Sequence, residues 1–420
     1  MKILHISTSD KTGGAAIAAL RLHNAMLSAG FDSKFLVLNR IHNDRNDIVT
    51  LYSWYIKIKK IINNKLESFV TKNMHKVNGL FSSFKYGISI SKRPEIIEAD
   101  IIYLHWINFS FINYRELKNI LKTGKPVFWF MHDMFAITGG CHHSFDCAKY
   151  QTKCCKCPYH YRGKMSADLS VWQYKTKKKI YKQFDNLMFI TPSKWLFDCV
   201  QKSGLAENKQ VWHIPNLIDT NIFKPIDKKT ARQLFSLNTN IKIIGFGADF
   251  ALTNSYKGWD YLKEAFQILS KNESLQGINI EVVIFGSSYS KKVADSLPFQ
   301  VHFLGHLYDE YSLAMVYNAM DVFVLPSLAE NFPNTILESL NCSTPVVGFN
   351  VGGIPDMINE NTGYLAEYKN SSDLAKGISL ILKKENANMN EYVKAFALET
   401  VLNKHIEAWN DGESQRKVMR

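Results

Sequence analysis

The sequence has 420 residues, of which 46% are hydrophobic and 21% are charged, and its formal net charge is +13. This length favours two domains, and the composition is typical of a globular enzyme and contains no apolar run long enough to cross a membrane. The excess of positive charge suits an anionic partner such as a nucleotide, a nucleic acid or a membrane surface, although extra lysines also serve solubility alone.

The amino terminus and the cysteines bear on the compartment. The first residues, MKILHIST, lack the apolar region and the small-residue cleavage site of a signal peptide, so we expect a buried first strand and a cytoplasmic protein. In that compartment the seven cysteines should be thiols or metal ligands rather than disulfides.

The first half of the chain alternates short apolar runs with amphipathic stretches. The expected strands are 2–8, 34–39, 99–106, 125–133 and 186–193, and the glycine turn and helix of 9–30 follow the first of them. Continuous apolar runs of this length resemble parallel strands that are buried on both faces. The rhythm predicts a doubly wound, Rossmann-like α/β domain over 1–215.

The same rhythm restarts after a segment that reads as a linker. Residues 213–225, HIPNLIDTNIFKP, contain two prolines and little periodicity. Strands and helices then alternate from 241 onward, which predicts a second Rossmann-like domain over 216–386. The tail, 387–420, is expected to be a helix that crosses back to the first domain. Ligands of such open sheets bind outside the carboxyl ends of the strands, so we expect two facing domains with a crevice between them.

Two glycine-containing turns stand at predicted strand ends. Gly13 and Gly14 precede a helix, where glycine lets the backbone approach a phosphate and the helix N-terminus favours negative charge. The pattern is not GxGxxG, and an ordinary strand-to-helix turn explains it equally. Lys257 and Gly258 follow the first strand of the second domain, where a lysine reaches a diphosphate as a point charge; a solvated surface lysine is the ordinary alternative.

The stretch PSLAENFPNTILESLNCSTPVVGFNVGGIPDMI, 326–358, combines two glutamates with a turn and a Gly-Gly pair. Glu330 precedes Pro333, which suits a helix start, while Glu338 lies within that helix. The two carboxylates therefore hold separate hydroxyl-bearing parts of one extended ligand rather than one atom. Helix N–H groups between them suit an anion, and Gly352 and Gly353 permit close approach. A capping or surface glutamate is the alternative for Glu338.

This stretch resembles the E-x(7)-E signature of the retaining glycosyltransferases of family 4, which have the GT-B architecture. The glycine turn after the first strand, the linker HIPNLIDTNIFKP and the segment 301–365 are similar to the corresponding parts of that family, in the same order. The resemblance covers nearly the whole chain except about 45–95. It implies transfer of a sugar from a nucleotide-diphosphate donor.

The resemblance also implies roles for individual residues. Glu330 would bind hydroxyls of the donor sugar near the reacting face, and Glu338 would accept hydrogen bonds from the ribose. Lys257 would stabilise the departing diphosphate, and His132 would stand beside the sugar as a catalytic residue. The remaining donor-binding positions are Gly13, Gly14, Asn331, Phe332, Asn334, Leu304 and Gly305.

The mechanism that the resemblance implies needs no metal ion or other catalytic cofactor. Retaining transfer passes through an oxocarbenium-like state, and Lys257 together with helix dipoles would receive the charge of the leaving diphosphate. Two departures from the family pattern stand out. An arginine is usual near Asp249 and is lacking here, and Ser343 occupies a position where glycine is common.

The segment 139–160 is rich in cysteine. Cys154 and Cys157 have the C-x(2)-C spacing of metal ligands, and Cys141 with Cys147 would complete a closed tetrahedral zinc site that is structural rather than catalytic. Cys155, His142, His143 and His160 lie in the same stretch. The cluster resembles an insertion in family members that build surface polysaccharides. Free thiols or redox pairing remain alternatives.

The basic insertion 45–95 includes a Lys-rich amphipathic stretch, 53–87, with interleaved Trp, Tyr, Ile and Phe. Such a helix can lie in a membrane interface, and a packed helix with a solvated lysine face is the alternative. We therefore predict a retaining transferase at the cytoplasmic face of the membrane that uses a lipid-linked glycan acceptor in surface-polysaccharide biosynthesis. A GT-B-fold nucleotide-sugar epimerase and a non-catalytic basic glycan- or nucleic-acid-binding protein are the alternatives, and no nucleic-acid-binding motif is visible.

Overall fold

The computed structural model describes residues 1–41, 45–51, 53–71, 80–158, 168–247, 252, 254–384 and 389–419. The chain forms two compact units, which we describe separately. The N-terminal unit comprises Met1–Asn216 together with Val401–Arg420, and the C-terminal unit comprises Leu217–Thr400. Asp249 and His160, which the sequence analysis singled out, lie outside the described residues, as do parts of the segments 45–95 and 139–160.

The N-terminal unit is built on a seven-stranded parallel sheet with the order β3-β2-β1-β4-β5-β6-β7. The strands are β1 (Lys2–Ser9), β2 (Asp32–Asn39), β3 (Ile48–Thr50), β4 (Ile101–Leu104), β5 (Val127–Phe130), β6 (Leu187–Thr191) and β7 (Val211–His213). The central strands are buried on both faces, which explains their continuous apolar sequences.

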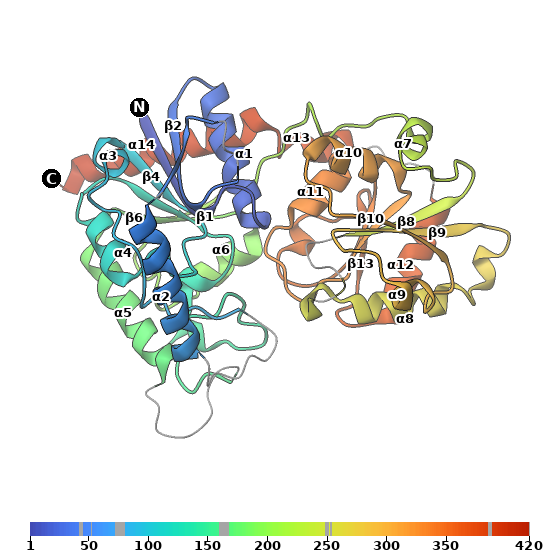
Figure 1. Ribbon diagram of the computed structural model, residues 1–420, viewed down its shortest axis with the longest axis horizontal. Helices are drawn as coiled ribbons and strands as arrows, with labels where there is room; N and C mark the ends of the chain where they lie inside the picture. Colours follow the sequence, from blue (N-terminus) through green and yellow to red (C-terminus); the bar gives the residue numbers. More distant parts are fainter. Residues whose placement is uncertain are drawn as a thin grey trace. The chain divides into compact units, whose positions relative to one another are not determined.

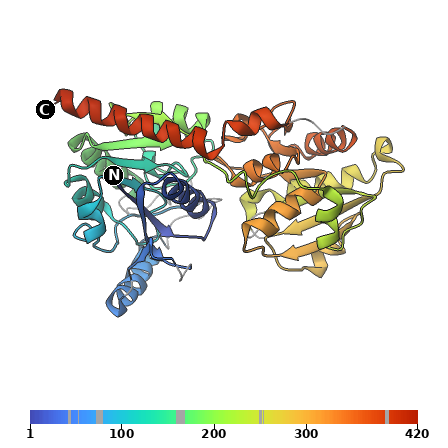
Figure 2. The ribbon, with the colours of Figure 1, turned by 90° about the horizontal axis from the view of Figure 1, so that it is seen from above.

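The helices of the N-terminal unit alternate with these strands along the chain. They are α1 (Gly14–Ser28), α2 (Trp54–Thr71), α3 (Pro94–Glu98), α4 (Tyr114–Leu121), α5 (Leu169–Gln183), α6 (Lys194–Gln201) and α14 (Leu398–Met419). Side chains of Asn113, Asp168 and Ser193 cap α4, α5 and α6. The final helix, α14, runs along this unit (Figure 2), where Trp409 donates a hydrogen bond to the hydroxyl of Tyr103 on β4.

The C-terminal unit contains a six-stranded parallel sheet with the order β10-β9-β8-β11-β12-β13 (Figure 1). The strands are β8 (Lys242–Gly247), β9 (Ile280–Phe285), β10 (Gln300–Gly305), β11 (Val322–Leu325), β12 (Val346–Phe349) and β13 (Gly363–Ala366). Its helices are α7 (Lys228–Leu234), α8 (Trp259–Leu269), α9 (Lys291–Ala294), α10 (Glu310–Ala319), α11 (Asn334–Asn341), α12 (Ser371–Lys383) and α13 (Asn390–Lys394). Two apolar clusters, one centred on α10 and α11 and the other on α8 and α12, form its core.

The predicted fold class, two doubly wound α/β domains, is confirmed by the two parallel sheets. The sequence reading missed β3, β7 and β13, which are short edge strands with little apolar periodicity. Ser343, which follows α11, has a φ of +58°, and this left-handed conformation explains why glycine suits that position. None of the helices in the described part of the chain is both long enough and apolar enough to cross a membrane.

Candidate active site

The C-terminal unit brings Lys257 and Glu330 together. Lys257 ends a short 3-10 turn, Ser255–Lys257, after β8, and Glu330 lies in the loop after β11. Because β8 and β11 are parallel neighbours, both loops leave the carboxyl edge of the sheet. The Lys257 Nζ lies 2.6 Å from Glu330 Oε1, and the two side chains are 20% and 14% exposed. A partly buried cation and carboxylate thus meet at the sheet edge where ligands of this fold class bind.

Two glycines allow the loops around this ion pair to touch. Gly258 has a φ of +74°, and a Cβ at this position would stand 1.8 Å from the carbonyl oxygen of Pro326. Gly352 has a φ of +58°, and its Cβ would stand 2.0 Å from the carbonyl oxygen of Glu330. The N–H of Gly353 donates to that same oxygen at 3.1 Å. The backbone of Glu330 is therefore fixed by direct contact with the loop after β12.

Glu338 occupies a different environment from Glu330. It lies on α11, is buried, and accepts a hydrogen bond from the Tyr317 hydroxyl at 3.0 Å. Asn331, Phe332 and Asn334 are also buried at the start of this helix, and Phe332 packs against Phe396 with ring centroids 5.8 Å apart. This part of the predicted site is consequently packed into the unit rather than spread over its surface.

The other predicted donor-binding positions are dispersed. Leu304 and Gly305 end the edge strand β10, where Gly305 has a φ of +67°. Gly13 caps α1 with a φ of +84°, and Gly14 is the first helical residue. Asp10, which the sequence reading overlooked, is buried beside this turn and accepts the backbone N–H of Ile41 at 2.9 Å. A charged residue directly after a buried strand is the signal that could have identified it.

His132 lies after β5 at the end of a row of histidines in the N-terminal unit. Its Nε2 is 3.1 Å from Nδ1 of His105, and Nε2 of His105 is 2.9 Å from Nδ1 of His5. His5 and His105 are fully enclosed, whereas the ring of His132 is half-buried. Burial lowers the pKa of His132 to about 4 and that of the other two well below the usual value, so all three are neutral at pH 7.

The neighbouring residue, Asp133, anchors a second polar network. Its Oδ2 accepts from His142 Nδ1 at 2.5 Å and from Trp106 Nε1 at 3.0 Å, and Ser82 Oγ lies 2.9 Å from His142 Nε2. Burial alone would raise the pKa of Asp133, but His142 and the Phe135 N–H lower it to about 2. This order of groups is that of a serine hydrolase triad. Ser82 and His142 are buried, however, so the network holds the loop that follows His132.

The cysteine-rich segment lies beside this network. Cys141, Cys154 and Cys157 are buried and Cys147 is partly exposed, and Cys154 Sγ accepts the Gly139 N–H at 3.2 Å. A hydrogen bond with Cys157, together with burial and neighbouring thiols, raises the pKa of Cys141 well above its usual value. Throughout the described part of the chain, no three His, Cys, Asp or Glu side chains are arranged as a metal ion would require.

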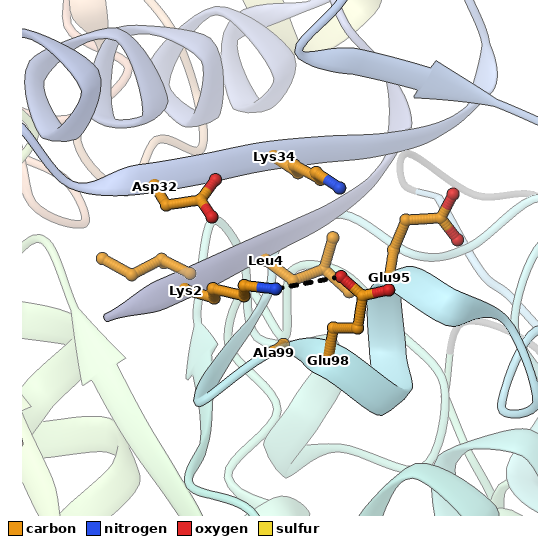
Figure 3. Close-up of a pocket in the computed structure, with 8 residues that line it drawn as sticks. Lys2, Leu4, Asp32, Lys34, Glu95, Glu98 and Ala99 are labelled. Atoms are coloured by element: carbon orange, nitrogen blue, oxygen red, sulfur yellow. Dashed lines mark hydrogen bonds and ion pairs between the residues drawn. The ribbon is translucent and has the colours of Figure 1, made fainter.

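A hollow elsewhere in the N-terminal unit is unrelated to this chemistry. It is lined by Lys2, Leu4, Asp32, Lys34, Glu95, Glu98 and Ala99 (Figure 3). These residues lie at the amino ends of β1 and β2 and on α3, at the sheet edge opposite His132 and Gly13. Lys2 and Glu98 form an exposed ion pair of 3.1 Å there.

A family model matches part of the chain. Residues 242–384 match the family model described as Glycosyl transferases group 1, which covers most of the C-terminal unit and includes Lys257, Glu330 and Glu338. An uncharacterized glycosyltransferase of Haemophilus influenzae is 26% identical over 163 residues, 37% of this chain and 45% of the relative. The chain thus spans less than half the length of that relative.

Two further relatives have names that specify a pathway or a substrate. The glycosyl transferase WcaC of Escherichia coli K12, named for colanic acid biosynthesis, is 22% identical over 371 residues, 86% of each chain. A Campylobacter jejuni enzyme, N,N'-diacetylbacillosaminyl-diphospho-undecaprenol alpha-1,3-N-acetylgalactosaminyltransferase, is 30% identical over 224 residues, 52% of this chain and 55% of the relative.

Solved structures establish the architecture. Sucrose-phosphate synthase from Thermosynechococcus elongatus aligns over 100% of this chain and 99% of its own, with a TM-score of 0.62 and 18% identity. The HepE protein of Anabaena, solved with UDP-glucose, aligns over 98% of this chain and 100% of its own, with a TM-score of 0.61 and 17% identity. The fold is that of the GT-B glycosyltransferases, as the sequence resemblance implied.

Proposed function

We propose that this protein is a retaining glycosyltransferase that moves a sugar from a nucleoside-diphosphate sugar to a glycan acceptor in surface-polysaccharide biosynthesis. The observation that carries the proposal is the Lys257–Glu330 pair at the carboxyl edge of the sheet, within the segment that matches the glycosyl transferases group 1. The names of the E. coli and C. jejuni relatives support the pathway and a lipid-linked acceptor. The relatives named above do not favour the epimerase or the non-catalytic alternative.

The pair divides the work between recognition and charge. The Lys257 ammonium stabilises the negative charge that develops on the departing diphosphate, and the N-terminus of α11 adds N–H groups of the same polarity. Glu330 accepts hydrogen bonds from sugar hydroxyls and keeps Lys257 extended until the donor binds. Charge compensation by these groups makes the transfer independent of a metal ion.

The histidine after β5 completes the proposal. His132 is neutral and its ring is partly accessible, so it exchanges a hydrogen bond with a sugar hydroxyl without adding charge. Retention follows if the acceptor attacks the face of the sugar from which the diphosphate leaves, with a donor phosphate oxygen taking the acceptor proton. Buried Glu338 supports α11 through Tyr317 and faces the ribose when the donor is bound.

A screen of nucleotide sugars tests the donor. Purified protein is heated with UDP, UDP-glucose and a panel of other nucleoside-diphosphate sugars, because a ligand that binds only the native state raises Tm. The best donor is then incubated with lipid-linked glycan acceptors, and the anomeric configuration of the product is read by NMR. Product of inverted configuration would contradict retention, and epimerised donor without transfer would support the rival enzyme.

The exposed face of α2 supports a membrane-bound location. The helix attaches to the unit through polar side chains: Asn63 donates to the Gly87 carbonyl at 3.2 Å, and Glu67 accepts the Ser83 N–H at 2.6 Å. Ile56 packs against the core of the unit, but most of the large apolar side chains of α2 point to solvent, with Trp54 74% and Phe69 76% exposed. The other exposed members are Tyr55, Ile58, Ile61, Ile62 and Leu66. Figure 2 shows the helix projecting from the unit.

An anionic bilayer is the occupant that this face fits. Lys57, Lys59 and Lys65 accompany the apolar residues, while Lys60 donates to Asn39 of the unit. Glu67, which binds Ser83, is the single acidic residue of α2. A helix with apolar and basic groups on its outer surface binds the headgroup region of anionic lipids. Membrane attachment would present the enzyme to a lipid-linked acceptor.

Vesicle sedimentation tests this attachment. The full chain should bind vesicles that contain phosphatidylglycerol and bind phosphatidylcholine vesicles more weakly. Phe69→Ser and Trp54→Ser should each weaken binding about tenfold or more, because each removes the burial of an aromatic ring. Tyr289→Ser, at a position 68% exposed in the C-terminal unit, serves as the control. Self-association of the chain through α2, without vesicle binding, would contradict the membrane proposal.

The structural zinc stays a prediction. A hydrogen bond joins Cys141 and Cys157, and the four thiols of Cys141, Cys147, Cys154 and Cys157 would have to rearrange into a tetrahedron around the ion. Zinc would displace the protons of the thiols, and its positive charge would offset the repulsion between the resulting thiolates. Metal analysis should find one zinc per chain, lost in Cys154→Ser and kept in Cys199→Ser. A content far below one would remove the zinc.

A further inference from the structure

The histidine row that ends at His132 begins at a methionine. His5 Nε2 lies 3.1 Å from the sulfur of Met26, a residue of α1. The row is therefore Met26 Sδ, His5, His105 and His132, with every ring nitrogen of His5 and His105 engaged. These residues come from α1, β1 and the loops after β4 and β5, and they lie within one unit.

The sulfur fixes the direction of every hydrogen bond in this row. A thioether sulfur has no hydrogen and only accepts, so His5 Nε2 must carry the proton that points at Met26. Neutral imidazole has one N–H, so His5 Nδ1 is then an acceptor and His105 Nε2 must donate to it. By the same step, His105 Nδ1 accepts and His132 Nε2 donates. The reverse order would place lone pairs of nitrogen and sulfur against each other at 3.1 Å.

The surroundings do not oppose this order. The row stays neutral because burial lowers the pKa of all three rings and so disfavours imidazolium. The carboxylate adjacent to His132 in the chain is Asp133, whose oxygens already accept from His142, Trp106 and the Phe135 N–H. Aromatic rings enclose the row: His5 stacks on Tyr103 at 5.0 Å, and His132 stacks on Phe130 at 5.0 Å. These contacts limit rotation of the rings.

We infer that Met26, His5 and His105 are positioning residues that hold His132 in its Nε2–H tautomer, so that Nδ1 presents a lone pair to the ligand. His132 then accepts a hydrogen bond from a sugar hydroxyl and does not donate one. The ligand in this statement rests on the proposed function. The tautomer is a property of the N-terminal unit alone.

Nitrogen NMR of the histidine side chains measures this tautomer without any substrate. In full-length protein labelled with 15N-histidine, the His132 ring should show a protonated Nε2 and an unprotonated Nδ1 at pH 7.5, with His132→Gln used to assign its signals. Protonated Nδ1 on His132, or an imidazolium, would overturn the inference. Because this readout needs no donor, its failure is separate from failure of the proposed transferase activity.

Two substitutions at His105 sharpen the test. His105→Asn retains a carbonyl acceptor near the position of Nδ1, whereas His105→Leu leaves the buried His132 N–H facing an alkyl group. We expect Nε2–H in the asparagine variant and a shift toward Nδ1–H in the leucine variant, with Tm measured for both. With the donor found by the nucleotide-sugar screen, kcat should fall about tenfold or more in the leucine variant and recover in the asparagine variant. Equal tautomers and equal kcat in the two folded variants would contradict the role.

Discussion

The two units place their predicted catalytic groups at the same kind of sheet edge but in opposite electrostatic states. In the C-terminal unit, Lys257 and Glu330 are charged, paired and partly exposed. In the N-terminal unit, His5, His105 and His132 are neutral and form one hydrogen-bonded row with two buried members. A charged pair can exchange its partner for a diphosphate or a sugar, while a neutral row keeps its geometry and adds no charge to an already anionic donor. Under the proposed function, the charged pair would compensate charge and the neutral row would orient a sugar hydroxyl.

The largest expected effect tests the charged side of this contrast. Lys257→Ala should lower kcat about 10²–10³-fold, because it removes the cation that faces the developing diphosphate charge. Initial rates with the identified donor and acceptor measure this. Lys2→Ala is the matched control. It also removes a lysine from an ion pair, but the partner is Glu98, and this exposed pair lies at the amino ends of the strands in the N-terminal unit. Near-normal turnover in a folded Lys257→Ala protein would refute the assignment.

The loop contacts behind Glu330 give the next effect. Gly352→Ala should lower both turnover and stability, since the added Cβ meets the Glu330 carbonyl oxygen at 2.0 Å. Gly277→Ala is matched in backbone conformation, with a φ of +80°, but its Cβ meets nothing within 4 Å. In the Gly277→Ala control, the free energy of unfolding should fall only by about 1–2 kcal/mol, the cost of a left-handed conformation for alanine, and kcat should be unchanged. Equal losses in the two variants would show that the contact does not position Glu330.

Acid should destabilise the two units unequally. Burial lowers the pKa of His23 and His132 to about 4 and also lowers that of His5, His105 and His405, and all five belong to the N-terminal unit. Unfolded histidine titrates near 6.5, so the stability that these residues contribute is complete above that pH. It falls as the pH drops toward 4, by about 1.4 kcal/mol per pH unit for each histidine. The two histidines of the C-terminal unit, His302 and His306, are not fully buried.

Hydrogen exchange by mass spectrometry between pH 7.5 and 5 separates the units. After correction for the intrinsic rate, peptides from β1, β4 and β5 should lose protection before peptides from β8 and β11. Simultaneous loss in both units would contradict the prediction.

The smallest effect concerns the end of α11. Ser343→Gly should raise the free energy of unfolding by about 1 kcal/mol, because serine has a φ of +58° there and glycine adopts that conformation without strain. Ser339→Gly, within the same helix, should have the opposite sign, since glycine weakens a helix interior and the Ser339 hydroxyl bonds the Thr344 carbonyl at 2.8 Å. Urea unfolding of both variants checks the signs, and a loss of stability in Ser343→Gly would contradict the strain.

The sequence by itself determined the alternation of strands and helices, because buried parallel strands require continuous apolar runs that are visible in one dimension. It also singled out Lys257, Glu330 and the glycines near them, since each lies in a loop that follows a predicted strand. The sequence predicted only part of the α2 feature. Its composition indicated an amphipathic helix, but the contacts of Asn63 and Glu67 with the unit were needed to show which face points outward.

Tertiary structure alone decided the polar networks. His5 and His105 are 100 residues apart, and His105 and His132 are 27 residues apart. No local sequence pattern predicts that the three rings form one row. The same holds for Ser82, Asp133 and His142, whose order in the chain gives no sign of their contacts. Hydrophobic periodicity is a local pattern that can be read from consecutive residues. Hydrogen bonds between distant side chains depend on strand order and on the positions of loops in space. For that reason the fold followed from the sequence, whereas the pairing of Lys257 with Glu330 and the inferred tautomer of His132 followed only from the structure.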